Sequence, residues 1–165
     1  MAAASDRDSI LSLLKNQQDG HLDLWRIVDR LDENFKQILQ SISRDERLQI
    51  LQIKDSESGE TFLHLAVIKI DAETVEMLLE GISEEARYIL LSAQCRDNFT
   101  PMHYACSYDH GRILGLLIRL LKEETWYKLL QRTTIRGVTP LHSSARAGQT
   151  QAISTIADSL TAHQL

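Results

Sequence analysis

The chain has 165 residues, of which 43% are hydrophobic and 25% are charged, and its formal net charge is −5 at pH 7. This composition is that of an ordinary globular chain, and its acidic balance excludes the concentrated basic face that nucleic-acid binding requires. No apolar run reaches 18 residues, so we expect no membrane insertion in this segment. The cysteines Cys95 and Cys106 have no C-x-x-C spacing and the N-terminus lacks a secretory pattern, which predicts a cytoplasmic setting.

Residues 1–40 contain two apolar patterns of helical period, a short one before Gly20 and a longer one after it. The longer pattern ends in Leu39 and Ile42, which align with apolar residues of the next unit. We therefore expect 1–40 to be a helical N-terminal cap or a degenerate leading repeat, with a helix over 35–41. Trp25 is interpreted as a core or cap anchor, and the alternative is a separate interaction helix that exposes it.

A six-residue motif occurs three times along the rest of the chain, as TFLHLA at 61–66, TPMHYA at 100–105 and TPLHSS at 139–144. Its threonines are 39 residues apart both times, from 61 to 100 and from 100 to 139. A fixed period of this size predicts stacked supersecondary units.

The residues around each threonine predict a tight turn followed by a helix. Gly59, Asn98 and Gly137 stand two positions before it, and these residue types tolerate positive φ best. They predict a left-handed corner in each unit. Pro101 and Pro140 follow the threonine, where the first turn of a helix does not need the missing N–H. The first unit has phenylalanine there, which weakens the helix start without excluding it.

After the motif, each unit predicts a short first helix and an amphipathic second helix. The apolar residues of the second helices are Val75, Leu78, Leu79, Ile113, Leu114, Leu117, Ile153, Ile156 and Leu160. Further residues follow with acidic starts, and Ser43 and Glu46 have the spacing of a capping box. We therefore expect an added helical turn or short third helix before each hairpin. The pair Glu84-Glu85 is interpreted as a solvated helix start and not as a catalytic dyad.

The TPLH motif at 139–142 resembles the signature of ankyrin repeats, although the period of 39 exceeds the family's usual value of about 33. The resemblance implies an all-α helical repeat solenoid with short β-hairpin or loop fingers. It would hold three ankyrin-like repeats over 41–165 behind the cap at 1–40. The implied function is a non-catalytic protein–protein interaction scaffold that binds a partner with its fingers and inner helices. The alternative is a structural or self-association segment of a larger ankyrin-containing receptor or channel.

The histidines of the motif, His64, His103 and His142, form a column at equal spacing. Zinc ligands must lie about 2 Å from one ion, whereas equivalent residues of stacked helices lie about 10 Å apart. The resemblance implies structural histidines whose ring nitrogens hold backbone groups. No nucleophile or phosphate-binding motif is present in the sequence, so we expect no enzyme activity and no cofactor or metal.

In the ankyrin architecture, partners contact the finger tips and the exposed edge of the first helix. An apolar cluster with tyrosine and arginine is typical of an interface, and the arginines favour an acidic or phosphorylated partner segment. Alternatively, Phe99 and Val138 pack on each other and bind nothing. We expect a monomer. The candidate partner-binding residues are Arg96, Asp97, Phe99, Tyr108, Ile135, Arg136, Val138 and Arg146.

The last unit leaves two alternatives open. Its second helix is apolar on one side and no polar capping unit follows it. Repeat arrays need polar outer faces at their ends. Either the array continues beyond this sequence, or polar residues of that helix, such as Gln151 and Asp158, form the outer face.

Overall fold

The structure is a computed structural model that describes residues 37, 39–69, 72–108 and 111–162. The helices and Trp25 predicted within residues 1–36 lie outside the described residues. The described helices are α4 (Arg44–Gln52), α5 (Phe62–Lys69), α6 (Ala72–Leu79), α7 (Glu84–Ser92), α8 (Pro101–Tyr108), α9 (Arg112–Arg119), α10 (Glu123–Leu130), α11 (Pro140–Ala147) and α12 (Thr150–Ala162).

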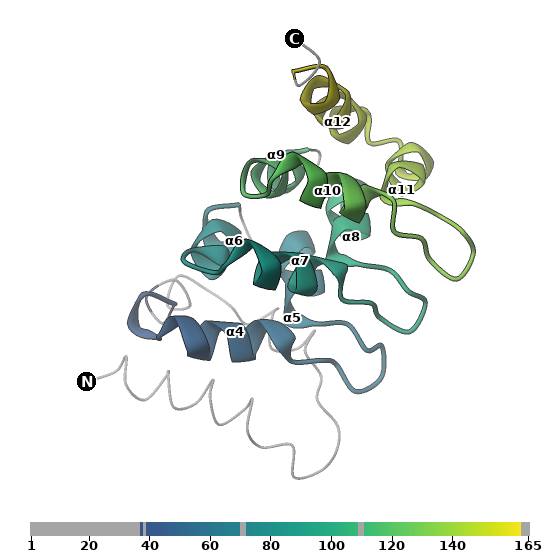
Figure 1. Cartoon of the computed structure of the whole chain (residues 1–165). Helices are drawn as coiled ribbons and strands as arrows, with labels where there is room; N and C mark the ends of the chain where they lie inside the picture. Colours follow the sequence, from purple (N-terminus) through teal and green to yellow (C-terminus); the bar gives the residue numbers. More distant parts are fainter. Residues whose placement is uncertain (1–36, 38, 70–71, 109–110, 163–165) are drawn as a thin grey trace.

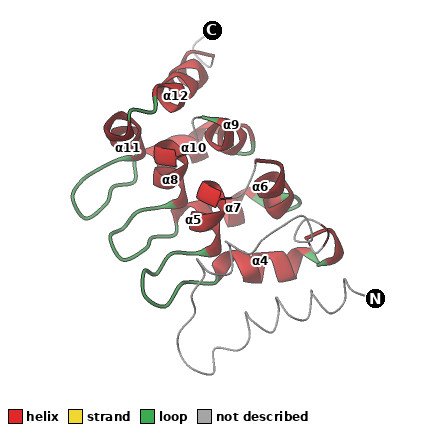
Figure 2. Cartoon of the chain, turned by 180° about the vertical axis from the view of Figure 1, so that it is seen from behind, coloured by secondary structure: helices red, strands yellow, loops and turns green. Residues whose placement is uncertain are grey.

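Equivalent helices of successive repeats stack on one another (Figure 1). The inner helices α5, α8 and α11 form one stack, and the outer helices α6, α9 and α12 form another. The third helices form the remaining stack, in which α7 packs on α10 and α4 lies beside α5. Figure 2, seen from behind, shows three long loops leaving the same side of these stacks. The helical solenoid and the third helix of the repeat are therefore both confirmed.

The loops that join a third helix to the next inner helix are the fingers, at residues 53–61, 93–100 and 131–139. Each turns through a residue with positive φ: Gly59 at 71°, Asn98 at 60° and Gly137 at 72°. The predicted left-handed corners are thus present in all three units. Within the described ranges, the extended pairing in the fingers is limited to one antiparallel bridge, between Lys54 and Thr61.

The first two motif histidines, His64 and His103, join their inner helices to the next finger. The Thr61 N–H donates to Nδ1 of His64 (3.0 Å), so the other ring nitrogen, Nε2, donates to the carbonyl of Phe99 (3.0 Å). His103 repeats this arrangement and its Nε2 donates to the carbonyl of Val138 (3.0 Å). Burial lowers the pKa of His64 to about 4, which favours the neutral ring. The expectation that these histidines are structural is confirmed.

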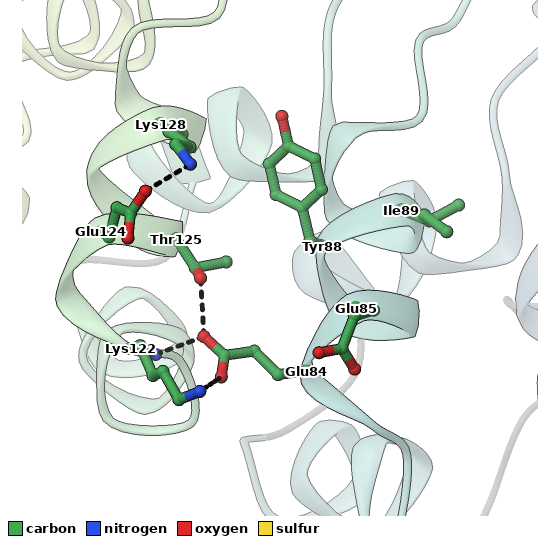
Figure 3. A pocket seen from close by; sticks show the side chains of 8 residues that line it. All are labelled: Glu84, Glu85, Tyr88, Ile89, Lys122, Glu124, Thr125 and Lys128. Carbon is green, nitrogen blue, oxygen red and sulfur yellow. Dashed lines mark hydrogen bonds and ion pairs between the residues drawn. The ribbon is translucent and has the colours of Figure 1, made fainter.

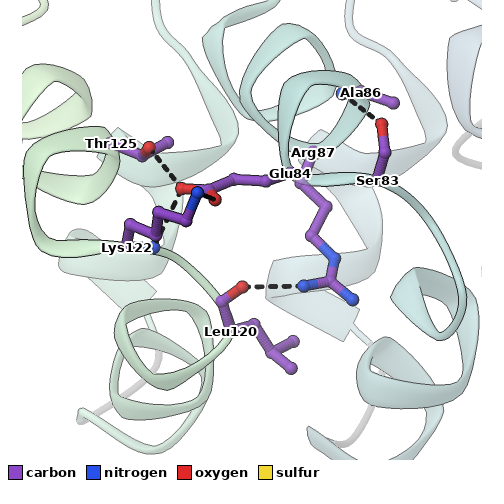
Figure 4. A network of polar contacts seen from close by, with 7 residues as sticks. All are labelled: Ser83, Glu84, Ala86, Arg87, Leu120, Lys122 and Thr125. Carbon is purple, nitrogen blue, oxygen red and sulfur yellow. Dashed lines mark hydrogen bonds and ion pairs between the residues drawn. The ribbon is translucent and has the colours of Figure 1, made fainter.

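Arginines of the third helices bind the C-terminal ends of the outer helices. Arg87 donates from Nη1 to the carbonyl of Leu120 (2.7 Å) and from Nε to the carbonyl of Leu79 (3.3 Å), as Figure 4 shows in part. Arg47 similarly donates to the carbonyl of Met77 (2.5 Å). Carbonyls in the last turn of a helix lack intrahelical partners and carry partial negative charge. Arg87 therefore links two neighbouring repeats.

The core runs continuously through the stacks. Leu39 and Ile42 are buried in it, as their alignment with the next unit predicts. The predicted apolar residues of α6 and α9 are also buried. In α12, Ile156 is buried but Ile153 and Leu160 are each 37% exposed, because in the described part of the chain no further unit covers them.

Candidate functional site

Backbone hydrogen bonds hold the three fingers in register. The Arg96 N–H donates to the carbonyl of Ser58 (3.0 Å), and the Ile135 N–H donates to the carbonyl of Asp97 (3.2 Å). These bonds join equivalent positions of successive fingers. The side chains at the finger tips are consequently presented in a fixed order along one edge of the solenoid.

A pocket of about 500 Å³ opens between the first two fingers and α8. We call it the finger pocket. Four of the eight predicted partner-binding residues line it together, namely Arg96, Asp97, Phe99 and Tyr108. The complete lining is Ser58, Glu60, Cys95, Arg96, Asp97, Phe99, Tyr104, Ser107 and Tyr108.

Three aromatic rings form one wall of the finger pocket. The rings of Phe99 and Tyr104 are stacked, with centroids 5.9 Å apart and planes at 22°. Tyr108 meets Tyr104 edge to face at 6.0 Å and 78°. The Phe99 ring also meets the ring of His103 edge to face at 5.5 Å, so the second finger packs against α8 at this point. Tyr104 was not among the predicted partner-binding residues, although its spacing of four residues from Tyr108 on a helix places both rings on one face.

A buried carboxylate forms the polar part of the same pocket. Glu60 is 6% exposed and accepts hydrogen bonds from the hydroxyls of Tyr104 and Ser58, the latter at 3.0 Å. Burial raises the pKa of Tyr104, and the hydrogen bond to Glu60 raises it further, so the phenol keeps its proton and donates. Glu60 directly precedes the motif threonine, as Phe99 and Val138 do in the next two units. Phe99 and Val138 were predicted to bind a partner, whereas Glu60 was not.

The other four predicted residues lie in the third repeat and do not line the finger pocket. Ile135 is 63% exposed at the tip of the third finger, and Arg136 beside it is also exposed. Val138 is partly buried, and its carbonyl accepts the bond from His103. Arg146 is exposed in the last turn of α11. The structure thus divides the predicted site into a pocket at the first two fingers and a basic, apolar surface at the third.

A second pocket, of about 420 Å³, lies between α7 and α10 (Figure 3). Its charged side chains pair with one another: Lys122 Nζ lies 3.0 Å from Glu84, and Lys128 Nζ lies 2.6 Å from Glu124. Ile89 at its margin is 63% exposed. These two ion pairs join four of the charged side chains that line the pocket, and a further carboxylate, Glu85, is exposed beside them.

The interpretation of Glu84-Glu85 as a solvated helix start is wrong for Glu84, because its carboxylate contacts the next repeat. Its Oε1 accepts from the Lys122 N–H (3.1 Å) and from the hydroxyl of Thr125 (2.6 Å), as Figures 3 and 4 show. These hydrogen bonds, led by that from Thr125, lower the pKa of Glu84. Lys122 is the N-cap of α10 and makes no side-chain capping bond. The carboxylate of one repeat therefore caps the third helix of the next repeat, whereas Glu85 beside it remains exposed.

Stacked three-helix units, fingers in register and structural histidines together define a helical repeat protein. The comparison with family models agrees, because the model described as ankyrin repeats (3 copies) matches residues 1–125. The chain belongs to the ankyrin repeat family. Helices α11 and α12 lie beyond the matched residues. They pack on α8 and α9 in the same way as α8 and α9 pack on α5 and α6.

Ankyrin repeats are generally non-catalytic protein–protein interaction modules. The comparison with curated proteins gave no match. Among the described residues, no helix combines the length and the apolar character needed to cross a membrane.

Proposed function

We propose that this chain is a cytoplasmic, non-catalytic interaction module that binds another protein across its fingers and inner helices. The observation that carries the proposal is the finger pocket, in which Phe99, Tyr104 and Tyr108 form an aromatic wall beside charged side chains. Aromatic residues and arginine dominate the binding energy of protein interfaces. Tyr108 is 56% exposed and already held by Tyr104, so a partner would gain contact area without ordering a loose side chain.

The third finger extends the proposed interface. Ile135 and Arg136 are exposed on the third finger, which follows the two fingers that line the pocket. The hydrogen bond from the Ile135 N–H to the carbonyl of Asp97 holds the third finger against the second. An extended segment of a partner would cross all three fingers. Arg136 and Arg146 favour an acidic or phosphorylated stretch of that segment at the third repeat.

A comparison of captured proteins tests this proposal. Wild-type chain is used as bait beside a finger variant, Tyr108→Ala/Ile135→Asp/Arg136→Glu, whose three residues are exposed. The matched control is Ile89→Asp/Tyr127→Ala/Lys128→Glu, which alters equally exposed residues of α7 and α10. We expect captured partners to bind the wild-type chain and the control variant directly and with similar affinity. Their affinity for the finger variant should be at least about tenfold lower. A verified partner that binds all three chains equally would contradict the proposed interface.

A second candidate function is self-association through the outer side of α12. Its support is the exposure of Ile153 and Leu160, whose equivalents in the two preceding units are buried, namely Val75, Leu114, Ile82 and Leu121. Sedimentation at increasing concentration tests it. Association that disappears in Ile153→Asp favours this function, and a monomer at all concentrations contradicts it.

A further inference from the structure

We propose that the outer edge of the third finger binds a tight turn of the partner protein. The outer edge is the side of residues 134–138 that faces away from the second finger. The turn carries an acidic residue at its second position and glycine or asparagine at its third. This inference rests on the proposed function and states the local structure and the charge that the partner segment takes at the third finger.

Two hydrogen bonds at a fixed spacing join the second finger to the repeat before it. The N–H of Arg96 donates to the carbonyl of Ser58 (3.0 Å). Three residues later, the carbonyl of Phe99 accepts from Nε2 of His64 (3.0 Å). The first repeat therefore recognises a backbone donor and a backbone acceptor that stand three positions apart.

The third finger repeats this spacing on the second repeat. The N–H of Ile135 donates to the carbonyl of Asp97 (3.2 Å). Three residues later, the carbonyl of Val138 accepts from Nε2 of His103 (3.0 Å). The arrangement is thus a repeated mode of recognition between one repeat and the finger that follows it.

The four-residue segment that makes these two bonds is a tight turn in both fingers. The Asn98 N–H donates to the carbonyl of Cys95 (3.0 Å), and the Gly137 N–H donates to the carbonyl of Thr134 (2.9 Å). Asn98 and Gly137 have positive φ, at 60° and 72°. Glycine and asparagine tolerate this conformation best. A ligand that binds in the same way therefore needs one of them at the third position of the segment.

The outer edge of the third finger presents the same two groups. Arg136 stands at the position of Asp97, and His142 stands at the position of His103. The Thr139 N–H donates to Nδ1 of His142 (3.3 Å), so Nε2 carries the ring proton and can donate. Within the part of the chain that the structure describes, the Arg136 carbonyl and the His142 Nε2 have no partner.

The next position in the series of fingers is open among the described residues. A Cβ on Gly59 would lie 3.5 Å from the backbone nitrogen of Arg96, because the second finger covers the first at this point. A Cβ on Gly137 would meet no described atom within 4 Å. Leu141 shows the same contrast, since it is 44% exposed whereas its equivalent Met102 is 0% exposed. The outer edge therefore continues the interface that joins successive fingers.

The charges of the third repeat favour an acidic residue in the turn. Residues 125–157 contain no aspartate or glutamate, although the chain as a whole is acidic. Their four cations are Lys128, Arg132, Arg136 and Arg146. Arg136 and Arg146 are exposed, and neither forms an ion pair with a described residue.

The position of the acidic residue follows from the register of the fingers. Arg136 holds the second position of its own segment, as Asp97 does in the second finger. Equivalent positions are neighbours in successive fingers, so the second position of a bound turn lies next to Arg136. A carboxylate at this position can accept charge-assisted hydrogen bonds from the guanidinium.

Titration with a closed turn peptide tests the inference. The complete chain is labelled with ¹⁵N. The probe is the sequence Thr-Val-Asp-Gly-Val-Thr, cyclised head to tail through D-proline and glycine, and its donor-to-acceptor segment is Val-Asp-Gly-Val. We expect the probe to shift the amides of 134–138 and 141–146 in a saturable way.

Two matched peptides separate the contributions to binding. One has asparagine in place of aspartate, which removes the charge. The other is methylated on the nitrogen of the first valine, which removes the donor to the Arg136 carbonyl. We expect affinity about threefold lower or more for the asparagine peptide and at least about fivefold lower for the methylated peptide.

Two exposed substitutions locate the effect on the chain. Arg136→Gln removes the guanidinium, and His142→Leu removes the ring donor. We expect each to weaken binding of the probe about threefold or more. Only Arg136→Gln should abolish the preference for aspartate over asparagine. Arg119→Gln alters an exposed arginine of α9, is the control and should leave the affinity unchanged.

The inference is overturned if the probe shifts no amide at its solubility limit, or if all three peptides bind equally. Unchanged binding in both Arg136→Gln and His142→Leu overturns it as well. Shifts of the same amides on raising the protein concentration without peptide would show that a second copy covers the edge, which also overturns it. A verified partner that needs Tyr108 but binds Arg136→Gln and His142→Leu like wild type would contradict the inference and leave the proposed function standing.

Discussion

The histidines of the repeated motif differ in burial and in the hydrogen bonds that they make, although the motif around them is the same. His64 and His103 are fully buried and bond both ring nitrogens to backbone groups, one in their own turn and one in the next finger. His142 is exposed, and its Nδ1 accepts from the Thr139 N–H (3.3 Å). Burial rather than motif identity therefore decides what each ring contributes.

Replacing His103 with alanine should destabilise the chain far more than replacing His142. In His103→Ala the partly buried carbonyl of Val138 and the buried N–H of Thr100 both lose their partner. We expect the free energy of unfolding to fall by about 2–4 kcal/mol. For His142→Ala we expect less than half of that loss. Urea denaturation of both variants measures the difference, and equal losses would contradict this account of the motif.

The low pKa of His64 predicts that the protein loses stability in mild acid. In the folded state this pKa is about 4 because burial penalises the charged ring, whereas the ordinary value is 6.5. Between these values the unfolded chain binds a proton that the folded chain does not, so stability falls as pH falls. The gap corresponds to about 3 kcal/mol, and burial lowers the pKa of His103 in the same direction.

Urea denaturation from about pH 7.5 to about pH 5 measures the first part of this loss, about 2 kcal/mol for His64, since histidine is the side chain that titrates there. The variant His64→Gln lacks the titrating ring and should show a shallower dependence on pH. A free energy of unfolding that stays constant over this range in the wild-type chain would show that the ring is not held neutral.

At the scale of the elements, the third helices distinguish this array from a repeat of two helices. Helix α4 packs beside α5, α7 packs beside α8, and α10 packs on α7 and α9. Side chains of α7 reach the ends of helices in the adjoining repeat. Arg87 binds carbonyls at the C-terminal ends of α6 and α9, and Glu84 caps the N-terminus of α10. The third helices therefore connect repeats through helix ends as well as through apolar contacts.

Removing Arg87 should cost more stability than removing an arginine of a surface ion pair. In Arg87→Gln the carbonyls of Leu79 and Leu120 lose charged donors in a partly buried setting, and we expect a loss of about 1–3 kcal/mol. The matched control Arg119→Gln breaks an exposed pair with Glu76 at 3.2 Å and should cost less than about 1 kcal/mol. Chemical denaturation measures the loss of unfolding free energy in both variants. A smaller loss for Arg87→Gln than for the control would refute the role of Arg87 in linking two repeats.

The elements were largely predictable from sequence because their signals are local. The prolines at helix starts, the positive-φ corners and the capping box at Ser43 and Glu46 all depend on residues a few positions apart, and the motif that contains several of them repeats at a fixed period. The Glu84 contacts were not predictable in this way. Glu84 and Lys122 are 38 positions apart, and the same acidic pattern at a helix start also occurs in a solvated helix.

The candidate site was predictable only in part for the same reason. Counting positions from the motif placed Arg96, Asp97, Phe99 and Tyr108 near one another, and they line one pocket. The contact between Tyr104 and Glu60 joins residues 44 positions apart in different repeats. No local pattern encodes that contact, and the acidic, aromatic character of the pocket depends on it.

At the scale of the whole molecule, the repeats form a linear stack in which each unit contacts its neighbours. Such a stack has one long edge along which equivalent residues are displayed in order. Here that edge carries the fingers, with an aromatic pocket at the first two, which Glu60, Arg96 and Asp97 also line, and exposed Ile135 and Arg136 at the third. The third helices lie along a separate stack, where Lys122 pairs with Glu84 and Lys128 pairs with Glu124 in the second pocket.

The measurement that tests the central proposal most directly is a hydrogen-exchange footprint of the chain with and without a verified partner. If the partner lies across the fingers and inner helices, amides of 56–60, 95–99 and 134–138 and of α8 should exchange more slowly in the complex, whereas those of α4, α7 and α10 should not change. Protection confined to the third helices, with unchanged exchange in all three fingers, would contradict the proposed interface.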